Sequence, residues 1–373
     1  MNNKNFVHYS DLTPSQAKIV NLPPTKNYVI TGAPGTGKTV VALYMAEKFS
    51  QSGKKVLFLV HNRPLMLYLQ SMYGNDSPFE INTFNAWFNK FYYNLCGKRV
   101  PNFEYDWEDI KGDLGTCAIQ YDYIIFDEAQ DFPIQLIDSV NQIAPYVACF
   151  FDANQRLNED SLDEDELLDL LGEMRPYPLL ENFRNTKEIF DFAKAFSSNE
   201  QPEANNSNGK KPYLIHVSGY EEQNNAILNI IKSNPDAKTI GIFANGKSIP
   251  VTFDTISKNT ELPVNAYLTK SKEFRSPDFT KDGVFILPYN CAKGLEFDVV
   301  IFTMCDKIYM PMGAEDPNTL LYVASTRAKQ KLYCIYSSMV CKTDKYINFF
   351  APVKDTINEL SEGILDWNLK ASK

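Results

Sequence analysis

The sequence has few of the residues from which metal centres and disulfide frameworks are built. It contains three histidines, His8, His61 and His216, and its seven cysteines include no Cys-x-x-Cys pair. A structural zinc site or a disulfide framework is therefore not expected. The cysteines are predicted to lie reduced in the core.

Positive charge is also scarce, and long apolar runs are missing. Lys and Arg total 37 against 46 Asp and Glu, which gives a net charge of −9. A protein that coats a duplex electrostatically would have the opposite balance, although a narrow nucleic-acid groove is not excluded. The first ten residues have no apolar signal-peptide core, and no stretch approaches roughly 18 uninterrupted apolar residues. These features favour a cytoplasmic protein without a membrane partner.

The composition and the pattern of apolar residues indicate two folded domains. The 373 residues are 44% apolar and 22% charged, which is typical of a globular protein of this size. Short β-branched and aromatic runs alternate with segments of helical spacing. The runs are 27–32, 54–60, 121–128, 146–152, 212–218, 239–245, 283–289, 298–304 and 332–338. This alternation predicts two tandem α/β domains with parallel sheets, at 1–176 and 177–373.

The segment GAPGTGKT follows a predicted strand and precedes a predicted helix, as a phosphate-binding loop requires. Its glycines let the backbone wrap closely, so that successive N–H groups point at a phosphate. A glycine-rich turn without function is the alternative, and the strand–loop–helix context disfavours it. The predicted ATP-binding residues are Gly32, Ala33, Pro34, Gly35, Thr36, Gly37, Lys38 and Thr39. Lys38 would supply charge to the β- and γ-phosphates, and Thr39 would offer its hydroxyl to Mg²⁺.

A second candidate element, IIFDEAQD at 124–131, ends a hydrophobic strand with paired acids. Asp127 is predicted to hold Mg²⁺ beside the phosphate loop. Glu128 is predicted to act as the base that orients the attacking water. A solvated acidic strand end is the alternative, and the phosphate loop upstream makes it the weaker one.

Seven segments follow one another in a characteristic order: LTPSQAKIV, GAPGTGKT, DEAQD, FFDANQR, ENFRN, CAKGLEFDVV and LYVASTRAK. In this order the chain resembles superfamily 1 helicases of the UvrD/Rep/PcrA type, from about residue 11 to residue 338. The resemblance implies two RecA-like P-loop NTPase domains with ATP in the cleft between them. It also implies an ATP-dependent helicase or translocase that acts on single-stranded nucleic acid, with DNA as the expected substrate.

The resemblance assigns three residues to the adenosine part of ATP. Gln16 resembles a glutamine that reads adenine ahead of the phosphate loop. Phe183 would stack on the base, with core packing as the alternative. Glu296 would accept a hydrogen bond from the ribose.

Three further residues are assigned by the resemblance to the phosphates. Gln155 resembles a γ-phosphate sensor that follows a strand. Arg184 and Arg327 resemble paired arginines that the second domain supplies to neutralise charge on the γ-phosphate. Arginine suits this task because its planar, permanently charged guanidinium engages phosphate oxygens bidentately.

The nucleic-acid motifs depart from the family pattern more than the nucleotide motifs do. His61 and Pro288 stand where threonine is usual, and Asn85 and Asn290 stand where histidine is usual. Asparagine still donates hydrogen bonds to phosphates. The nucleic-acid contacts are therefore predicted at Asn62, Thr83, Phe84, Asn85 and Asn290.

The chain lacks the large accessory insertions of processive relatives, and only a small helical insertion is expected near 88–120. Its aromatic residues either stack on bases or pack together, and packing is favoured. They are Trp87, Phe88, Phe91 and Tyr92.

Residues 159–173 hold eight acids and no base, in a region where the family usually carries aromatics that stack on DNA bases. Acids favour a helix N-terminus, so an ordinary helix start is one interpretation. A surface for a protein partner, or a flap over the groove, is the other. This second interpretation supports an alternative function: an ATPase switch that controls a protein partner such as a phage-defence effector nuclease. An inert helicase-derived module is disfavoured because the catalytic motifs are intact.

Overall fold

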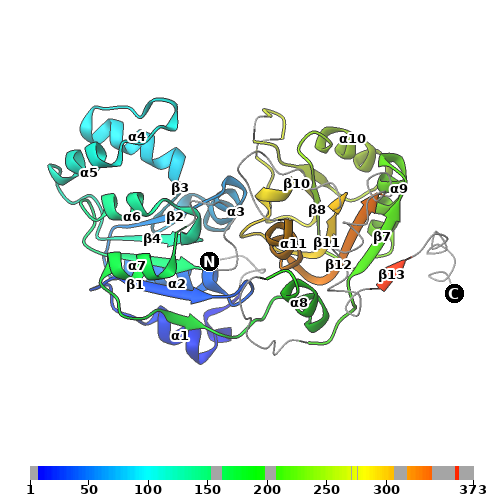
Figure 1. The fold of residues 1–373 in the computed structure, drawn as a ribbon, viewed down its shortest axis with the longest axis horizontal. Coiled ribbons are helices and arrows are strands. Elements are labelled where there is room, and N and C mark those ends of the chain that lie inside the picture. The colour runs from blue at the N-terminus through cyan, green and yellow to red at the C-terminus, as the bar shows by residue number, and fades with distance from the viewer. Residues whose placement is uncertain are drawn as a thin grey trace. The chain divides into compact units, whose positions relative to one another are not determined.

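The structure is a computed structural model that describes residues 7–152, 162–197, 207–269, 271–274, 276–305, 317–337 and 358–360. The chain divides into two compact units, Met1–Glu181 and Asn182–Lys373 (Figure 1). The division falls after Glu181 rather than after residue 176, because strand β6 (Tyr177–Leu179) pairs with β1 (Tyr28–Gly32) of the first unit.

The first unit contains a six-stranded parallel sheet in the order β3-β2-β4-β5-β1-β6. The four predicted strands are confirmed as β1, β2 (Val56–Val60), β4 (Tyr123–Asp127) and β5 (Val147–Phe151). Strands β3 (Glu80–Thr83) and β6 form the two edges of the sheet and were not predicted. Both are too short to give an apolar run in the sequence.

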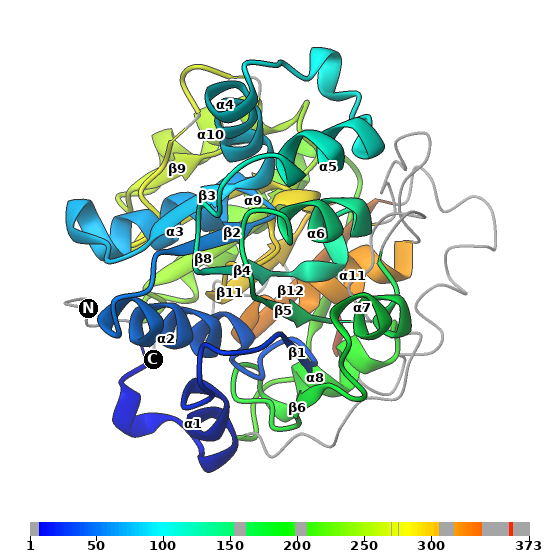
Figure 2. The same cartoon turned by 90° about the vertical axis from the view of Figure 1, so that its left-hand side faces the viewer.

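Helices cover both faces of this sheet (Figure 2). One face packs on α1 (Pro14–Val20), α2 (Lys38–Gln51) and α3 (Arg63–Tyr73). The other packs on α4 (Phe84–Cys96), α5 (Trp107–Gly115), α6 (Ile134–Val140) and α7 (Glu164–Leu171). Successive strand residues point to opposite faces, so a strand buried on both faces is apolar along its length, as β2 is and as β4 is up to its last residue, Asp127.

The second unit contains a seven-stranded sheet in the order β13-β7-β12-β11-β8-β10-β9, with parallel pairing throughout. The five predicted strands are confirmed, and the short strands β9 (Val264–Ala266) and β13 (Asn358–Leu360) were not predicted. The confirmed strands are β7 (Tyr213–Val217), β8 (Thr239–Ala244), β10 (Gly283–Pro288), β11 (Phe297–Phe302) and β12 (Ala328–Ser337). The helices are α8 (Lys187–Lys194), α9 (Tyr220–Lys232), α10 (Ile249–Asn259) and α11 (Pro317–Ser325). The predicted tandem of RecA-like α/β domains is thus the observed fold.

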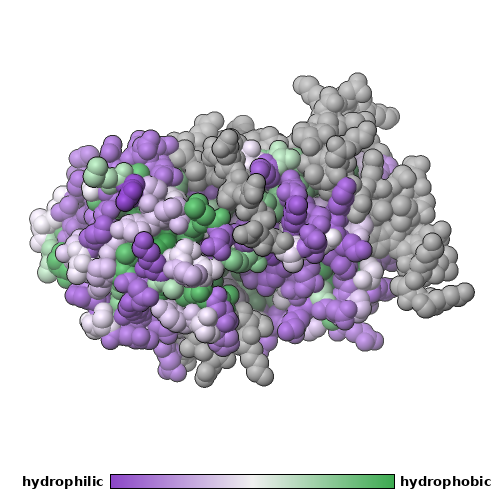
Figure 3. All heavy atoms as spheres, turned by 90° about the horizontal axis from the view of Figure 1, so that it is seen from below, coloured by the Kyte–Doolittle hydropathy of each residue, from purple (hydrophilic) through white to green (hydrophobic). Residues whose placement is uncertain are grey.

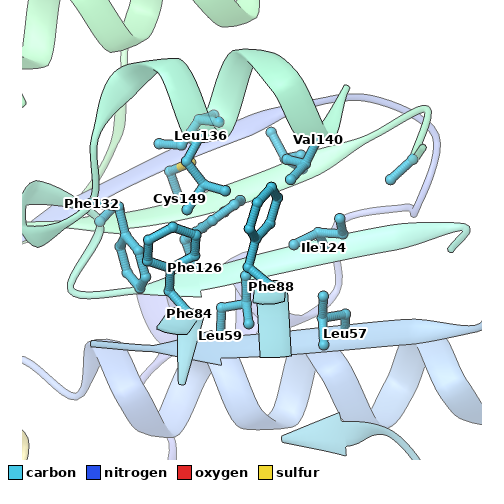
Figure 4. Close-up of a cluster of buried hydrophobic side chains, with 14 of the residues drawn as sticks. Leu57, Leu59, Phe84, Phe88, Ile124, Phe126, Phe132, Leu136, Val140 and Cys149 are labelled. Atoms are coloured by element: carbon cyan, nitrogen blue, oxygen red, sulfur yellow. The ribbon is translucent and has the colours of Figure 1, made fainter. Parts of the chain in front are cut away.

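Most aromatic residues of α4 belong to the core, whereas Tyr93 is exposed. Trp87, Phe88 and Tyr92 are at most 3% exposed, and Phe91 stacks on Trp87 with ring centroids 4.7 Å apart. The ring of Phe88 lies among apolar side chains of the sheet and of α6 (Figure 4). Packing, the favoured interpretation of this aromatic run, is confirmed.

The surface carries polar and apolar side chains, and the described cysteines differ in their burial. Hydrophilic side chains predominate on the face drawn in Figure 3, with apolar areas scattered between them. Cys149, Cys305 and Cys334 are buried as predicted, but Cys96, Cys117 and Cys291 are partly exposed. Within the described ranges, no helix is both long and apolar enough to cross a bilayer.

Candidate nucleotide site

The phosphate loop joins β1 to α2 in the first unit, and its glycines are there for geometric reasons. Gly35 and Gly37 adopt φ values of 82° and 84°, in the left-handed region that glycine tolerates best. A Cβ atom at Gly37 would lie 2.5 Å from Nε2 of Gln16, and one at Gly32 would lie 2.9 Å from the carbonyl oxygen of Leu179. Larger residues at these positions would displace the neighbours that hold the loop.

Lys38 is the first residue of α2, and its side chain folds back over the loop. Its ammonium is 6% exposed and donates to the carbonyl oxygens of Gly32 (2.6 Å) and Ala33 (3.2 Å). It also pairs with Oδ2 of the buried Asp152 at 3.1 Å. The charge is thereby held at the loop, beside the N-terminus of a helix, where anions bind favourably.

Thr39 and Asp127 meet beside the loop, as predicted. The hydroxyl of Thr39 donates to Oδ2 of Asp127 over 2.8 Å. Asp127 is fully buried, and no described residue hydrogen-bonds to its Oδ1 atom. Burial and the neighbouring charge of Glu128 raise the pKa of Asp127 to about 7. A buried carboxylate oxygen next to a hydroxyl is a donor set that suits a hard cation such as Mg²⁺.

Glu128 follows β4 with a left-handed backbone (φ 59°, ψ 51°), which is uncommon for a residue other than glycine. Its carboxylate is 4% exposed and accepts a hydrogen bond from Nε2 of Gln130 over 2.7 Å. Oε1 of Gln130 accepts from the backbone N–H of Asp152 over 3.0 Å. The sequence analysis assigned no role to Gln130 or Asp152, although Gln130 lies in the motif DEAQD and Asp152 lies in the motif FFDANQR.

Gln16 is bound to the loop itself. Its Nε2 atom donates to the carbonyl oxygen of Thr36 over 2.9 Å, and its Oε1 atom accepts from the backbone N–H of Thr13 over 3.0 Å. The second bond belongs to a capping box at the start of α1. The amide of Gln16 therefore joins α1 to the phosphate loop, and contact with adenine remains a prediction.

The second unit brings together three of the residues assigned to ATP, with a fourth that was not foreseen. Nε of Arg184 donates to Oε2 of Glu296 over 2.9 Å, and Nζ of Lys329 pairs with Oε1 of Glu296 at 2.8 Å. Partial desolvation of the carboxylate opposes its ionisation, but the two adjacent cations outweigh this and lower the pKa of Glu296 to about 2. Arg327 is 1% exposed and donates from Nε to the carbonyl oxygen of Val323 over 3.0 Å.

Two buried asparagines hold the loop that carries Arg184. Oδ1 of Asn182 accepts from the backbone N–H of Arg184 over 3.0 Å. Nδ2 of Asn185 donates to the carbonyl oxygens of Thr326 (3.2 Å) and Ala328 (2.6 Å). Between them, Phe183 is 53% exposed, so core packing does not account for it.

The residues predicted to contact nucleic acid lie in different environments, some at the surface and one in the core. Oδ1 of Asn62 caps α3 by accepting from the N–H of Leu65, and Oδ1 of Asn85 accepts from the hydroxyl of Tyr105. The prediction that Phe84 contacts nucleic acid is wrong. Phe84 is 9% exposed and its ring packs against Phe88, so it belongs to the core (Figure 4). Thr83 ends β3, and Asn290 lies exposed in the second unit.

The acidic segment begins a helix. Asp163 is the N-cap residue of α7, accepting from the N–H of Asp165, and three acids occupy the first turn. The helix-start interpretation is confirmed for these residues. Residues 159–161 and the proposed sensor Gln155 lie outside the described ranges.

Two family models and one solved structure are similar to parts of the chain. A family model described as the UvrD-like helicase C-terminal domain matches residues 260–339, which bears out the UvrD resemblance there. No curated protein matches the chain. Among solved structures, the C-terminal domain of a possible DNA helicase from Lactobacillus plantarum is similar at 20% identity. That match covers 48% of this chain and 98% of the other, with a TM-score of 0.33.

A second family model, described as the Schlafen group 3 DNA/RNA helicase domain, matches residues 25–271. This range includes the phosphate loop, the acidic element after β4 and the loop of Arg184. It covers more than half of the chain. The chain therefore belongs to the Schlafen group 3 DNA/RNA helicase domain family.

Proposed function

We propose that the chain is an ATP-dependent helicase or translocase that acts on single-stranded nucleic acid, with DNA as the favoured substrate. The observation that carries the proposal is the phosphate loop with the Lys38 ammonium held over it and the Thr39–Asp127 pair beside it. Membership of a helicase family supports action on nucleic acid. The asparagines at positions 62, 85 and 290 are the proposed phosphate contacts.

Lys38 and the N–H groups at the start of α2 would bind the phosphates of ATP. Thr39 and Asp127 would hold Mg²⁺, since the hydroxyl and the buried Oδ1 atom of Asp127 supply oxygen ligands. When bound, Mg²⁺ supplies charge neutralisation to the phosphates. Glu128 would accept a proton from the attacking water, or orient it.

The second unit would contribute its cations to the same reaction. In this proposal, Arg184 and Arg327 neutralise charge that develops on the γ-phosphate, Glu296 binds the ribose, and Phe183 stacks on the base. An arginine in this role contributes roughly 10³–10⁵ in rate. Binding of ATP would close the two domains and hydrolysis would reopen them, so that their hold on the strand alternates.

Steady-state ATPase activity, measured with and without single-stranded DNA and single-stranded RNA, tests the proposal. We expect stimulation by a single strand, larger for DNA, and no turnover above background in Lys38→Ala. Stimulation by RNA alone would show that the substrate is RNA and not DNA. Turnover that depends on Lys38 but ignores both strands would support the alternative, an ATPase switch for a protein partner. The position of Asp163 as N-cap, with three acids in the first turn, gives these acids a local role that needs no partner.

A further inference from the structure

Gln130 is a buried glutamine to which the proposed function assigns no role. It lies in the 3-10 turn Ala129–Asp131 and is fully buried. Both ends of its amide are engaged, one by the carboxylate of Glu128 and one by the backbone N–H of Asp152. A flipped amide would set its oxygen against the carboxylate and its NH₂ group against an N–H group, so this orientation is the only one that satisfies both partners.

A carboxylate at position 128 needs an external partner to hold it. The left-handed backbone turns Glu128 out of the direction of β4, so the strand does not by itself orient the side chain. A general base must keep an oxygen within hydrogen-bond reach of the water that it activates. Misplacement of such a group by about 1 Å can cost on the order of 10²-fold in rate.

Asp152 supplies the anchor for this glutamine. It follows β5, which lies between β4 and β1 in the sheet. Its side chain pairs with Lys38, while its backbone N–H holds Gln130. One residue thus fixes the phosphate-binding ammonium through its carboxylate and fixes Gln130 through its main chain.

Resting on the proposed function, we propose that Gln130 is a positioning residue for ATP hydrolysis. It holds the carboxylate of Glu128 in the orientation from which that carboxylate meets the attacking water. It acts only through Glu128 and not through the bound nucleotide. Loss of Gln130 should therefore slow hydrolysis and leave nucleotide binding almost unchanged.

The test uses Gln130→Leu and Gln130→Met, which both remove the two hydrogen bonds, the methionine keeping the unbranched shape of glutamine. Single-turnover hydrolysis and the Kd of a fluorescent ATP analogue are measured with Mg²⁺ present. We expect the rate to fall about 10- to 100-fold and the Kd to change less than about twofold. Gln135→Leu, the same exchange at an exposed position of α6, is the matched control and should behave as wild type.

A double-mutant comparison separates positioning from a merely structural role. In a Glu128→Gln background the carboxylate that Gln130 holds is already gone, so Gln130→Leu should add little further loss. A purely structural contribution would instead multiply with the loss from Glu128→Gln.

Three results would overturn the inference. The first is a hydrolysis rate within twofold of wild type in Gln130→Met, which also serves as the test if Gln130→Leu fails to fold. The second is a full multiplicative loss in the double mutant. The third is a Kd that rises as much as the rate falls. Wild-type hydrolysis by Glu128→Gln is a different failure, because it would remove the base assignment in the proposed function itself.

Discussion

The two units hold their candidate ATP-binding cations in different ways. In the first unit, two of the contacts of Lys38 are with carbonyl groups of its own loop, five and six residues away, and one is with the distant Asp152. In the second unit, Arg184 is fixed by Glu296 and by the carbonyl of Thr326, which are 112 and 142 residues away. The first arrangement is mainly local and visible as a motif, whereas the second depends on the completed fold.

The largest effect on ATP hydrolysis is expected when Lys38 of the phosphate loop is replaced. Lys38→Ala should abolish hydrolysis, because it removes the charge at the loop and leaves Asp152 buried without that cation. Lys48→Ala, at the other end of α2, removes the same charge from the surface and should leave turnover unchanged. Steady-state ATPase assays of both variants provide the measurement. Equal rates in the two would contradict the phosphate-loop assignment.

The long-range arrangement should show the next largest effect. Arg184→Ala should lower kcat by roughly 10³-fold or more if it neutralises the γ-phosphate. Arg184→Lys should recover little, because an ammonium lacks the planar fork. The control is Lys194→Ala, an exposed cation at the end of α8. A kcat for Arg184→Ala that matches this control would restrict Arg184 to its ion pair with Glu296.

A smaller effect, on stability, is expected when Asn185, which helps to hold the loop of Arg184, is replaced. Asn185→Ala leaves the carbonyl groups of Thr326 and Ala328 without their buried donor. The free energy of unfolding should fall by about 1–3 kcal/mol, as read from urea denaturation. No loss of stability would show that the loop of Arg184 is held by other contacts.

The smallest effect is a dependence on pH in the second unit. The pKa of Glu296 in the folded chain is lowered from its ordinary value of 4.5 to about 2. The ion pairs therefore stabilise the fold above pH 4.5, and this contribution is lost as the pH falls towards 2. Wild type should exceed Glu296→Gln in urea midpoint at pH 7, and by less at pH 3. An equal difference at both values would contradict the lowered pKa.

The difference between the units also explains what the sequence could predict. The phosphate loop follows from a local motif, and the Thr39–Asp127 pair follows from two parallel strands, β1 and β4, whose carboxyl ends lie at the same edge of the sheet; both were predicted. The contacts that Gln130 makes with Asp152, and that Lys329 makes with Glu296, join residues that are distant in the chain, so no sequence pattern encodes them.

Edge strands and one aromatic residue were missed for related reasons. Strands β3, β6 and β9 have three or four residues and give no apolar run. Phe84 stands beside a nucleic-acid motif, where an aromatic on the surface and one in the core look the same in sequence. The burial of Phe84 assigns it to the core, and this burial depends on the packing of α4 against the sheet.

The position of β1 in its sheet has a consequence for the order of assembly during synthesis. Strand β1 is the first strand of the chain, yet both of its partners, β5 and β6, lie more than 100 residues further on. Contacts between distant segments form slowly because a long loop must first close. The phosphate loop thus obtains its neighbouring strand β6 only after residue 179 has emerged from the ribosome. Nucleotide can therefore stabilise the first unit only at a late stage of its synthesis.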